Sequence, residues 1–288
     1  MTIDIDKLMR LDIPVVRQEL DANAIAFYAL SVGVGHDSLD REQLAFVDPL
    51  RGPQVMPSMV LVMAHPGFYL GHPESGVDPK AVLHADQSFE IRGSLPGEGT
   101  VTSRTRIVDV VDKGPGKAAL ILAETELSDD SGRVFATLGR TTFIRGGGGF
   151  GGASAPAAPA SRPAPPEGPP DHVIELGTRP EQALLYRLNG DMNPLHSDPG
   201  LAAGMGFGRP ILHGLCTMGV VCHAVLRGLA GYRAEALKQM RLRFSEPVLP
   251  GETIKTELWN DGRFRALVPS RDTVVIDGGL AVVERPNL

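Results

Sequence analysis

The tetrapeptide Leu95-Pro96-Gly97-Glu98 returns as Leu249-Pro250-Gly251-Glu252, 154 residues further along the chain. A Pro followed by a Gly is typical of a tight turn, because each residue supplies the backbone angles that the turn needs. Gly35 and Gly190, which each follow a helical pattern, are separated by nearly the same distance, 155 residues. Because unrelated features share nearly the same offset, the sequence indicates an internal duplication of one structural unit.

Between the two copies lies a segment with almost no core-forming residues. Residues 146–171 are rich in Gly, Ala and Pro, which favours an extended or disordered linker. The segment also contains a Gly-x-Gly-x-x-Gly spacing from Gly146, but no strand or helix pattern surrounds it, so we do not interpret it as a nucleotide site. We therefore predict two folded units, residues 1–145 and residues 172–288, joined by this linker.

Each copy contains helical patterns followed by four strand-like segments. In the second copy, Thr178 and Glu181 have the spacing of a capping box, and Pro180 lies in the predicted first turn. A buried helix followed by a run of strands predicts an α+β class, in which an antiparallel sheet wraps around a central helix. This arrangement matches the hot-dog fold, so the chain is expected to be a double hot-dog. The predicted helices are 21–30, 57–64, 178–188 and 214–229; the predicted strands are 85–91, 99–109, 118–128, 134–144, 239–244, 252–259, 263–268 and 273–283.

The composition excludes several classes of protein. The chain has 288 residues, 42% of them hydrophobic, and a net charge of −6 that comes entirely from residues 1–145. A nucleic-acid-binding protein would need a basic excess, and a membrane protein an apolar run of about 18 residues. The start of the chain lacks the pattern of a signal peptide, and Cys216 and Cys222 are badly placed for a disulfide, so we expect a cytoplasmic protein.

The segment from Tyr186 to His196 places an acid, an amide and a base within six residues. Asp191, Asn193 and His196 follow a helix and flank a Pro, and Gly214 opens an apolar helix 18 residues after the His. An acid, a base and a backbone N–H at a helix N-terminus are the groups that move protons beside a carbonyl. Taken singly, each has an ordinary structural explanation, such as an Asx turn for Asp191.

Other chemistries have little support in the sequence. There is no Gly-x-Ser-x-Gly, no His-Glu-x-x-His and no paired Cys-x-x-Cys, so we expect neither a serine hydrolase, nor a metal site, nor a bound cofactor. We interpret His213 as structural and the helix around Cys216 as core. The corresponding loop of the first copy, residues 31–37, lacks the acid–base motif, so His36 and Asp37 are expected to be surface or turn residues.

The motif Tyr-x-Leu-x-Gly-Asp-x-Asn-Pro-Leu-His resembles the signature of the R-specific enoyl-CoA hydratases, the hydratase 2 or MaoC-like family. Residues 183–219 are similar to the hydratase part of the peroxisomal multifunctional enzyme type 2, and the likeness extends over nearly the whole chain. The resemblance implies that Asp191 and His196 are the catalytic pair and that the N–H of Gly214 stabilises an oxyanion. Asn193 would orient the pair or the substrate. Asn189 departs from the small residue that the family usually has there.

The resemblance also implies that the first copy helps to bind coenzyme A. The positions of the family's His-Gly pair and Lys fall on His84, Ala85 and Lys113, where Ala85 departs from Gly. Phe244 matches a family position that contacts the ligand. An exposed lysine in a hairpin turn and an inward-facing strand aromatic are the structural alternatives for Lys113 and Phe244.

The sequence thus predicts reversible hydration of 2-trans-enoyl-CoA to (3R)-3-hydroxyacyl-CoA. His196 is expected to activate the water, and Asp191 to handle the proton at C2, although the sequence does not fix this division. The degenerate first copy would leave room for a medium or long acyl chain. The alternatives are a (3R)-hydroxyacyl-carrier-protein dehydratase, a hot-dog thioesterase and a non-catalytic acyl-thioester-binding subunit. Two hot-dogs in one chain form a pseudo-dimer, and a homodimer of the whole chain is also allowed.

Overall fold

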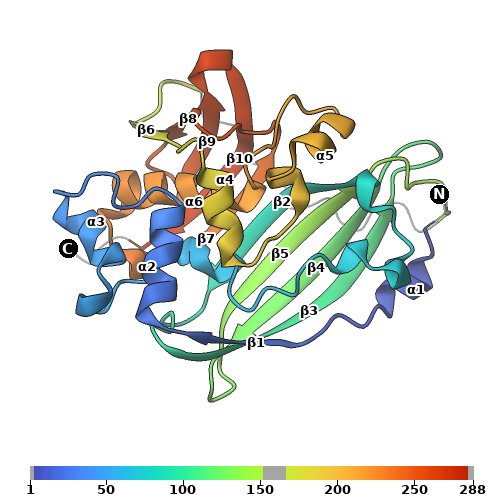
Figure 1. Cartoon of the computed structure of the whole chain (residues 1–288), viewed down its shortest axis with the longest axis horizontal. Helices are drawn as coiled ribbons and strands as arrows, with labels where there is room; N and C mark the ends of the chain where they lie inside the picture. Colours follow the sequence, from blue (N-terminus) through green and yellow to red (C-terminus); the bar gives the residue numbers. More distant parts are fainter. Residues whose placement is uncertain (1–2, 152–166, 285–288) are drawn as a thin grey trace.

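The computed structural model describes residues 3–151 and 167–284, and ten of its strands form one antiparallel sheet. The strand order is β1-β3-β4-β5-β2-β7-β10-β9-β8-β6 (Figure 1). The first five strands in chain order are β1 (Val16–Leu20), β2 (Val82–Ile91), β3 (Gly99–Asp112), β4 (Ala119–Ser128) and β5 (Val134–Ile144). The other five are β6 (His172–Gly177), β7 (Leu237–Phe244), β8 (Thr253–Leu258), β9 (Arg263–Val268) and β10 (Thr273–Val283).

The strand order repeats between the two halves of the chain. The first half runs β1-β3-β4-β5-β2 and the second runs β6-β8-β9-β10-β7, which is the same order of equivalent strands. The halves meet where β2 pairs with β7, in a register that runs from Asp86 opposite Arg243 to Glu90 opposite Gln239. We call this pairing the seam. The α+β class and the duplicated antiparallel sheet are therefore confirmed.

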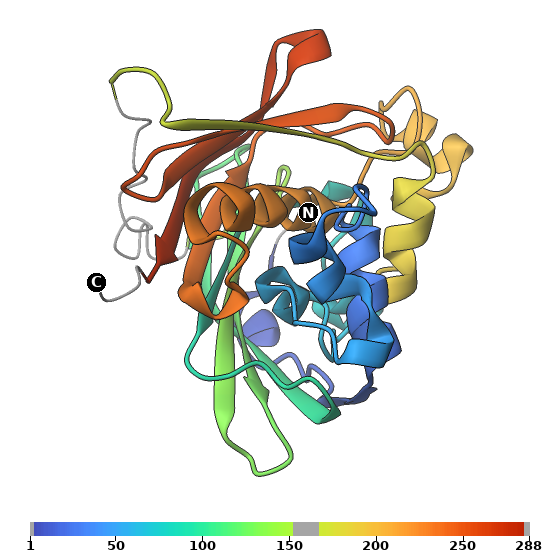
Figure 2. The ribbon, with the colours of Figure 1, turned by 90° about the vertical axis from the view of Figure 1, so that its left-hand side faces the viewer.

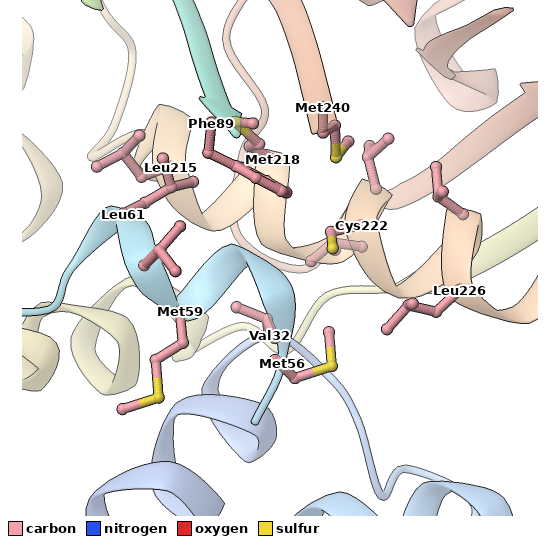
Figure 3. Close-up of a cluster of buried hydrophobic side chains, with 14 of the residues drawn as sticks. Val32, Met56, Met59, Leu61, Phe89, Leu215, Met218, Cys222, Leu226 and Met240 are labelled. Atoms are coloured by element: carbon pink, nitrogen blue, oxygen red, sulfur yellow. The ribbon is translucent and has the colours of Figure 1, made fainter. Parts of the chain in front are cut away.

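The helices gather on the concave side of the sheet, and the strands curve around them (Figure 2). The central helix, α6 (Gly214–Val225), is buried along nearly its whole length, which explains why its sequence is apolar on every side. Its packing against the first half joins the two copies in one core (Figure 3). The other helices are α1 (Ile5–Met9), α2 (Ala22–Ser31), α3 (Arg41–Val47), α4 (Gln182–Tyr186) and α5 (Pro199–Gly204).

The helix predicted over residues 57–64 is wrong in type and length. This segment forms only a 3₁₀ turn, Pro57–Leu61. The chain then reverses at Ala64, whose φ of 47° is left-handed. Side chains from the first half hold this bend, because Gln18 Oε1 accepts from the N–H of Ala64 at 2.6 Å and Ser103 Oγ donates to its carbonyl. These long-range bonds replace the helical ones that the local sequence favoured.

The predicted capping box is also wrong. The hydroxyl of Thr178 accepts from the N–H of Gly251 at 2.9 Å and donates to the carbonyl of Glu252 at 2.8 Å. Thr178 therefore ties the start of this segment to the second copy of the duplicated turn. Helix α4 begins only at Gln182, whose own side chain accepts from the N–H of Arg179.

The first residues of the predicted linker have defined positions. The exposed carboxylate of Asp112 accepts from the N–H groups of Gly149 at 2.7 Å and Gly151 at 2.9 Å. These bonds, with that from Gly114, lower the pKa of Asp112 against a small opposing effect of desolvation. The disorder expected for residues 152–166 lies outside the described residues. No helix in the described part of the chain is long and apolar enough to cross a membrane.

Candidate active site

The loop that follows α4 carries the acid and the base. A 3₁₀ turn, Arg187–Asn189, ends at Gly190, whose φ of 115° lies in a region that side chains strongly disfavour. Asp191 Oδ1 then accepts from the N–H of Asn193 at 3.1 Å, and Asn193 Oδ1 accepts from the N–H of Leu195 at 3.0 Å. These two Asx bonds fold the loop into a second 3₁₀ turn that ends at His196.

Asn189, the departure from the family pattern, has an explanation in the structure. Its side-chain N–H₂ donates to Ser31 Oγ and to the carbonyl of Tyr186, each at 2.9 Å. Gln182 donates to the carbonyl of the same serine at 2.6 Å. The degenerate loop of the first copy therefore supports the helix that leads into the acid–base loop. His36 and Asp37 are exposed, as the sequence predicted.

Asp191, His196 and His213 lie together, with one polar side-chain atom of each within 4.8 Å of the others. His196 Nδ1 is 2.9 Å from the carbonyl oxygen of Ile211. A carbonyl only accepts, so Nδ1 carries the proton, and the Nε2 of a neutral His196 keeps a free lone pair. The backbone thus fixes the tautomer in which His196 can serve as a base.

His213 lies against both partners of this pair. Its ring stacks on His196 with centroids 3.7 Å apart and planes at 27°. Its Nε2 is 3.2 Å from the backbone carbonyl of Asp191, and the ring of Tyr186 packs nearby, with centroids 5.1 Å apart. His213, which we interpreted as structural from the sequence, therefore contacts both His196 and Asp191.

Burial and mutual charge set the protonation states of the site. Burial lowers the pKa of His196 below its ordinary value, although the Ile211 carbonyl and Asp191 oppose this shift. Burial also lowers the pKa of His213 to about 3, with a further contribution from His196. For Asp191, burial raises the pKa, but His213, the Asn193 N–H and His196 outweigh burial and lower it overall. At neutral pH the site thus holds one carboxylate and two neutral imidazoles.

Gly214 is the first residue of α6, directly after His213. Its N–H has no acceptor within the helix and lies at the positive end of the helix dipole. A Cβ on Gly214 would lie 3.3 Å from the ring of Phe244, which is tighter than ordinary packing. Glycine therefore lets the Phe244 ring pack closely against the start of α6.

His84, Ala85 and Lys113 of the first half were expected at the site. His84 contacts another residue of the predicted site, Phe244. Its ring lies 4.8 Å from that of Phe244, across the seam, and burial lowers its pKa well below the ordinary value. Ala85 lies at a bulge in β2, between His84 and Asp86. Lys113 is exposed at the turn after β3, where its N–H bonds to the Ala118 carbonyl.

Two further residues near the site, His65 and Arg140, were missed by the sequence reasoning. Burial lowers the pKa of His65 to about 4, Arg140 lowers it further, and Asp191 opposes them, so all three groups lie within electrostatic range. Both residues come from the first copy, far from the motif, and neither has a local pattern that marks it.

A small cavity of about 30 Å³ begins at Leu215, the neighbour of Gly214, and reaches under the first half of the sheet. A larger hollow of about 270 Å³ lies along the seam and is lined by Ser88, Arg241 and Arg243 among others, and Arg140 lines both spaces. Asp191, His196 and Gly214 line neither space. The space nearer to them is the smaller one, because it includes Leu215, the neighbour of Gly214, and His65, which lies within electrostatic range of Asp191. Its lining is Leu61, Met63, His65, Pro66, Tyr69, Gln87, Thr105, Ala123, Thr125, Leu138, Arg140 and Leu215.

Comparison with known proteins finds two family models that match this chain. A model of the MaoC-like domain matches residues 161–276, and one of the MFE-2 hydratase 2 N-terminal domain matches residues 19–146. Enoyl-CoA hydratase ChsH3 of Mycobacterium tuberculosis is 38% identical, over 98% of this chain and 99% of its own. The peroxisomal enoyl-CoA hydratase 2 of Arabidopsis thaliana is 36% identical, over 95% of this chain and 93% of its own.

The fold agrees with these sequence matches. The crystal structure of a MaoC-like dehydratase from Phytophthora capsici superposes with a TM-score of 0.84 at 31% identity, and 99% of each chain is covered. The double hot-dog fold and the match to the MaoC-like domain place the chain in the class of MaoC-like proteins. The chain belongs to the hydratase 2 branch of this family, because relatives with that name match it over nearly its whole length.

Proposed function

We propose that this protein hydrates 2-trans-enoyl-CoA reversibly to (3R)-3-hydroxyacyl-CoA. The observation that carries the proposal is the arrangement of Asp191 and His196, which present a carboxylate and a free imidazole nitrogen close together. The open N–H of Gly214 supplies the third requirement, a donor for the thioester oxygen. Membership of the hydratase 2 family supports the same reaction.

In the proposed reaction, the Asp191 carboxylate and His196 Nε2 hold one water molecule beside C3 of the substrate. His196 takes a proton from this water as its oxygen bonds to C3. The electrons of the C2–C3 double bond move toward the thioester oxygen, and the N–H of Gly214 stabilises the resulting enolate. The enolate then takes a proton at C2 and the thioester carbonyl forms again, so that one water has been added.

The protonation states constrain the route of the C2 proton. Asp191 has a lowered pKa and is ionised at neutral pH, so it holds no proton of its own. The proton that reaches C2 therefore comes from the added water, by way of the His196 imidazolium. Delivery by Asp191 requires that Asp191 first receives this proton from His196.

The second candidate is dehydration of a (3R)-hydroxyacyl group on an acyl carrier protein. Both carriers present the same phosphopantetheine arm, so the acid–base loop accepts either one. The name of the Phytophthora relative favours this direction, whereas the acidic first half favours CoA, since carrier proteins are themselves acidic. Activity that is higher on the carrier-bound than on the CoA-bound substrate would select the dehydratase.

The test is loss of enoyl absorbance with crotonyl-, octenoyl- and dodecenoyl-CoA, together with the chirality of the product. Asp191→Asn and His196→Gln should each lower kcat by at least about 100-fold. The matched controls are Asp37→Asn and His36→Gln in the degenerate loop of the first copy, which should leave kcat unchanged. An S product, or full activity in the Asp191 and His196 variants, contradicts the proposal.

The three clustered side chains also resemble a metal site, and a chelator tests this. The rings of His196 and His213 are stacked instead of converging, and Asp191 Oδ1 already accepts a backbone N–H. We therefore expect the hydratase to keep its full activity after dialysis against EDTA. Activity that disappears and returns with added zinc would assign the cluster to a metal.

Chain length, compartment and assembly remain proposals. We propose a medium or long acyl chain, which must displace flexible side chains such as Met63, because the cavity holds roughly one water molecule. Activity that ends at four carbons would contradict this. We also propose that Lys113 and Ala85 contact the CoA and that the protein is cytoplasmic. We further propose that it can form a homodimer, and light scattering tests this by measuring the molar mass.

A further inference from the structure

Several polar residues line the small cavity beside Gly214. The proposed hydration of an enoyl group with a simple alkyl chain gives them no role. The apolar lining residues of the cavity include Leu61, Met63, Leu138 and Leu215. The polar lining residues are His65, Tyr69, Gln87, Thr105, Thr125 and Arg140. Thr105 and Thr125 satisfy each other through a hydroxyl–hydroxyl bond of 2.8 Å, and Gln87 bonds to His84 at 2.9 Å.

Arg140 is the charged member of this polar lining. It lies on β5 between Leu138 and Thr142, which are both buried, so the alternation of the strand turns all three toward the concave side of the sheet. Its cross-strand neighbours there are Gln87 on β2 and Ala123 on β4. Neither neighbour carries a negative charge.

The guanidinium of Arg140 lacks a counter-ion among the described residues. Its Nε is buried and has no hydrogen-bond acceptor, and the hydroxyl of Tyr69 in the same lining is likewise buried without a partner. The nearby imidazoles of His65 and His84 have lowered pKa values and are neutral at pH 7. Buried donors without acceptors are costly, so a ligand that supplies acceptors to both Arg140 and Tyr69 would be bound favourably.

We infer that Arg140 selects substrates whose acyl group carries an anionic oxygen, in particular a carboxylate at or near its far end. This inference rests on the proposed hydratase function and names the class of acyl group. A guanidinium binds a carboxylate through two parallel N–H bonds, and the Tyr69 hydroxyl provides a third donor in the same lining. The cavity volume of about 30 Å³ has room for one small polar group before any side chain moves.

The position of the cavity assigns this anion to the acyl part and not to coenzyme A. The cavity begins next to the residue that faces the thioester oxygen and extends inward, under the sheet and against the buried side chains of Leu61 and Leu138. The phosphates of CoA are strongly hydrated groups at the opposite end of the substrate. We therefore do not expect the phosphates in a pocket that lies on the acyl side of the thioester.

The experiment compares 2-hexenoyl-CoA with 2-hexenedioyl-CoA, whose acyl chain ends in a carboxylate. The wild type should prefer the dicarboxylic substrate in kcat/KM, and Arg140→Met should lower kcat/KM for it by roughly 10- to 100-fold, the range expected for a lost charge-assisted bond. The loss for 2-hexenoyl-CoA should be much smaller, because no charged group of that substrate reaches Arg140, so the ratio of the two kcat/KM values is the quantity that decides. Arg104→Met, which removes an exposed arginine from β3, is the matched control and should change neither substrate.

The outcomes separate this inference from the proposed function. Equal kcat/KM for the two substrates in the wild type, or an equal loss for both in Arg140→Met, overturns the role of Arg140 and leaves the hydratase assignment intact. Weaker inhibition of Arg140→Met by free CoA would place the arginine on the CoA arm and also overturns it. Failure of the wild type to hydrate either substrate overturns the proposed function itself. Thermal unfolding of the variant shows that any loss does not come from misfolding.

Discussion

At the scale of single residues, Gly214 is the position where space is tightest at the site. An added Cβ would press on the Phe244 ring at 3.3 Å, so Gly214→Ala moves the helix start or the ring and misplaces the N–H. We expect kcat to fall by up to about 100- to 1000-fold, the range measured for the loss of an oxyanion donor. Steady-state kinetics of Gly214→Ala and of the double variant with Phe244→Leu check this. Partial recovery in the double variant is expected, and no recovery would mean that the ring is not the obstacle.

The histidine pKa values predict how activity depends on pH. His196 works as a base only when it is neutral, and its pKa is lowered from 6.5 by burial. As the pH falls, activity is therefore lost only when the pH passes through this lowered value. The acid limb of kcat/KM should lie below pH 6.5. An acid limb at or above 6.5 would show that His196 is not held neutral in this way.

At this scale the sequence predicted the motif but not its surroundings. Asp191, His196 and Gly214 could be found because they lie within one short segment and at the start of the next helix. His65 and Arg140 come from the other copy, 126 and 51 residues before Asp191, and reach the site only through the fold. His213 was interpreted as structural because its contacts with His196 and with the Asp191 carbonyl depend on the tertiary arrangement.

At the scale of elements, α6 of the second copy packs closely against Val32, the residue that follows α2 in the first copy. A Cβ on Gly219 of α6 would lie 2.5 Å from Cγ1 of Val32, a distance that side chains do not tolerate. Gly219→Ala should therefore reduce the free energy of unfolding by about 1–3 kcal/mol, although alanine is the better helix former. Denaturant unfolding measures this change.

Two further variants make the result specific. Gly219→Ala combined with Val32→Ala removes the contact at 2.5 Å, whereas Cβ of residue 32 stays at 3.1 Å, so the double variant should recover part of the loss. Gly204→Ala in α5, where an added Cβ meets nothing within 4 Å, should leave stability unchanged or slightly improve it. Equal effects at Gly219 and Gly204 would show that crowding at the helix contact is not the cause.

Elements with strong internal periodicity were predicted within a few residues, and the weakly patterned ones were not. Strands β5, β9 and β10 have the predicted bounds. The two outer strands, β1 and β6, were missed because they are short and partly exposed, so their alternation is incomplete. The segment 57–64 contains apolar residues at helical density, but side chains from β1 and β3 fix its exit. Local propensity contains no information about such bonds.

At the scale of the whole molecule, several buried histidines link stability to pH. The pKa is lowered to about 4 for His65, about 3 for His213 and about 4 for His223, in each case chiefly by burial. The unfolded chain takes up these protons near pH 6.5, whereas the folded chain does not. Stability is therefore complete above pH 6.5 and falls as the pH decreases toward 4.

The expected decrease is large enough to measure. A loss of a few kcal/mol in a chain of this size corresponds to a Tm that falls by roughly 5 to 10 °C between pH 7 and pH 4.5. Calorimetry or circular dichroism at fixed ionic strength measures it. His223→Leu, which removes one buried neutral imidazole away from the acid–base loop, should make the slope shallower. A Tm that is constant over this interval would contradict the buried, neutral state of these rings.

The seam between β2 and β7 has a consequence for how such a molecule changes over time. Its register is maintained by main-chain pairing from residue 86 to residue 90 against residues 239 to 243, which fixes spacing and leaves much of the side-chain choice open. A symmetric pair of identical subunits would receive every substitution twice, once in each site. In this chain each substitution occurs once, so one copy was free to lose its acid and base while the other kept them. This asymmetry lets Arg140 and His65 of the first copy change as substrate-facing residues. The acid–base loop of the second copy is not altered by those changes.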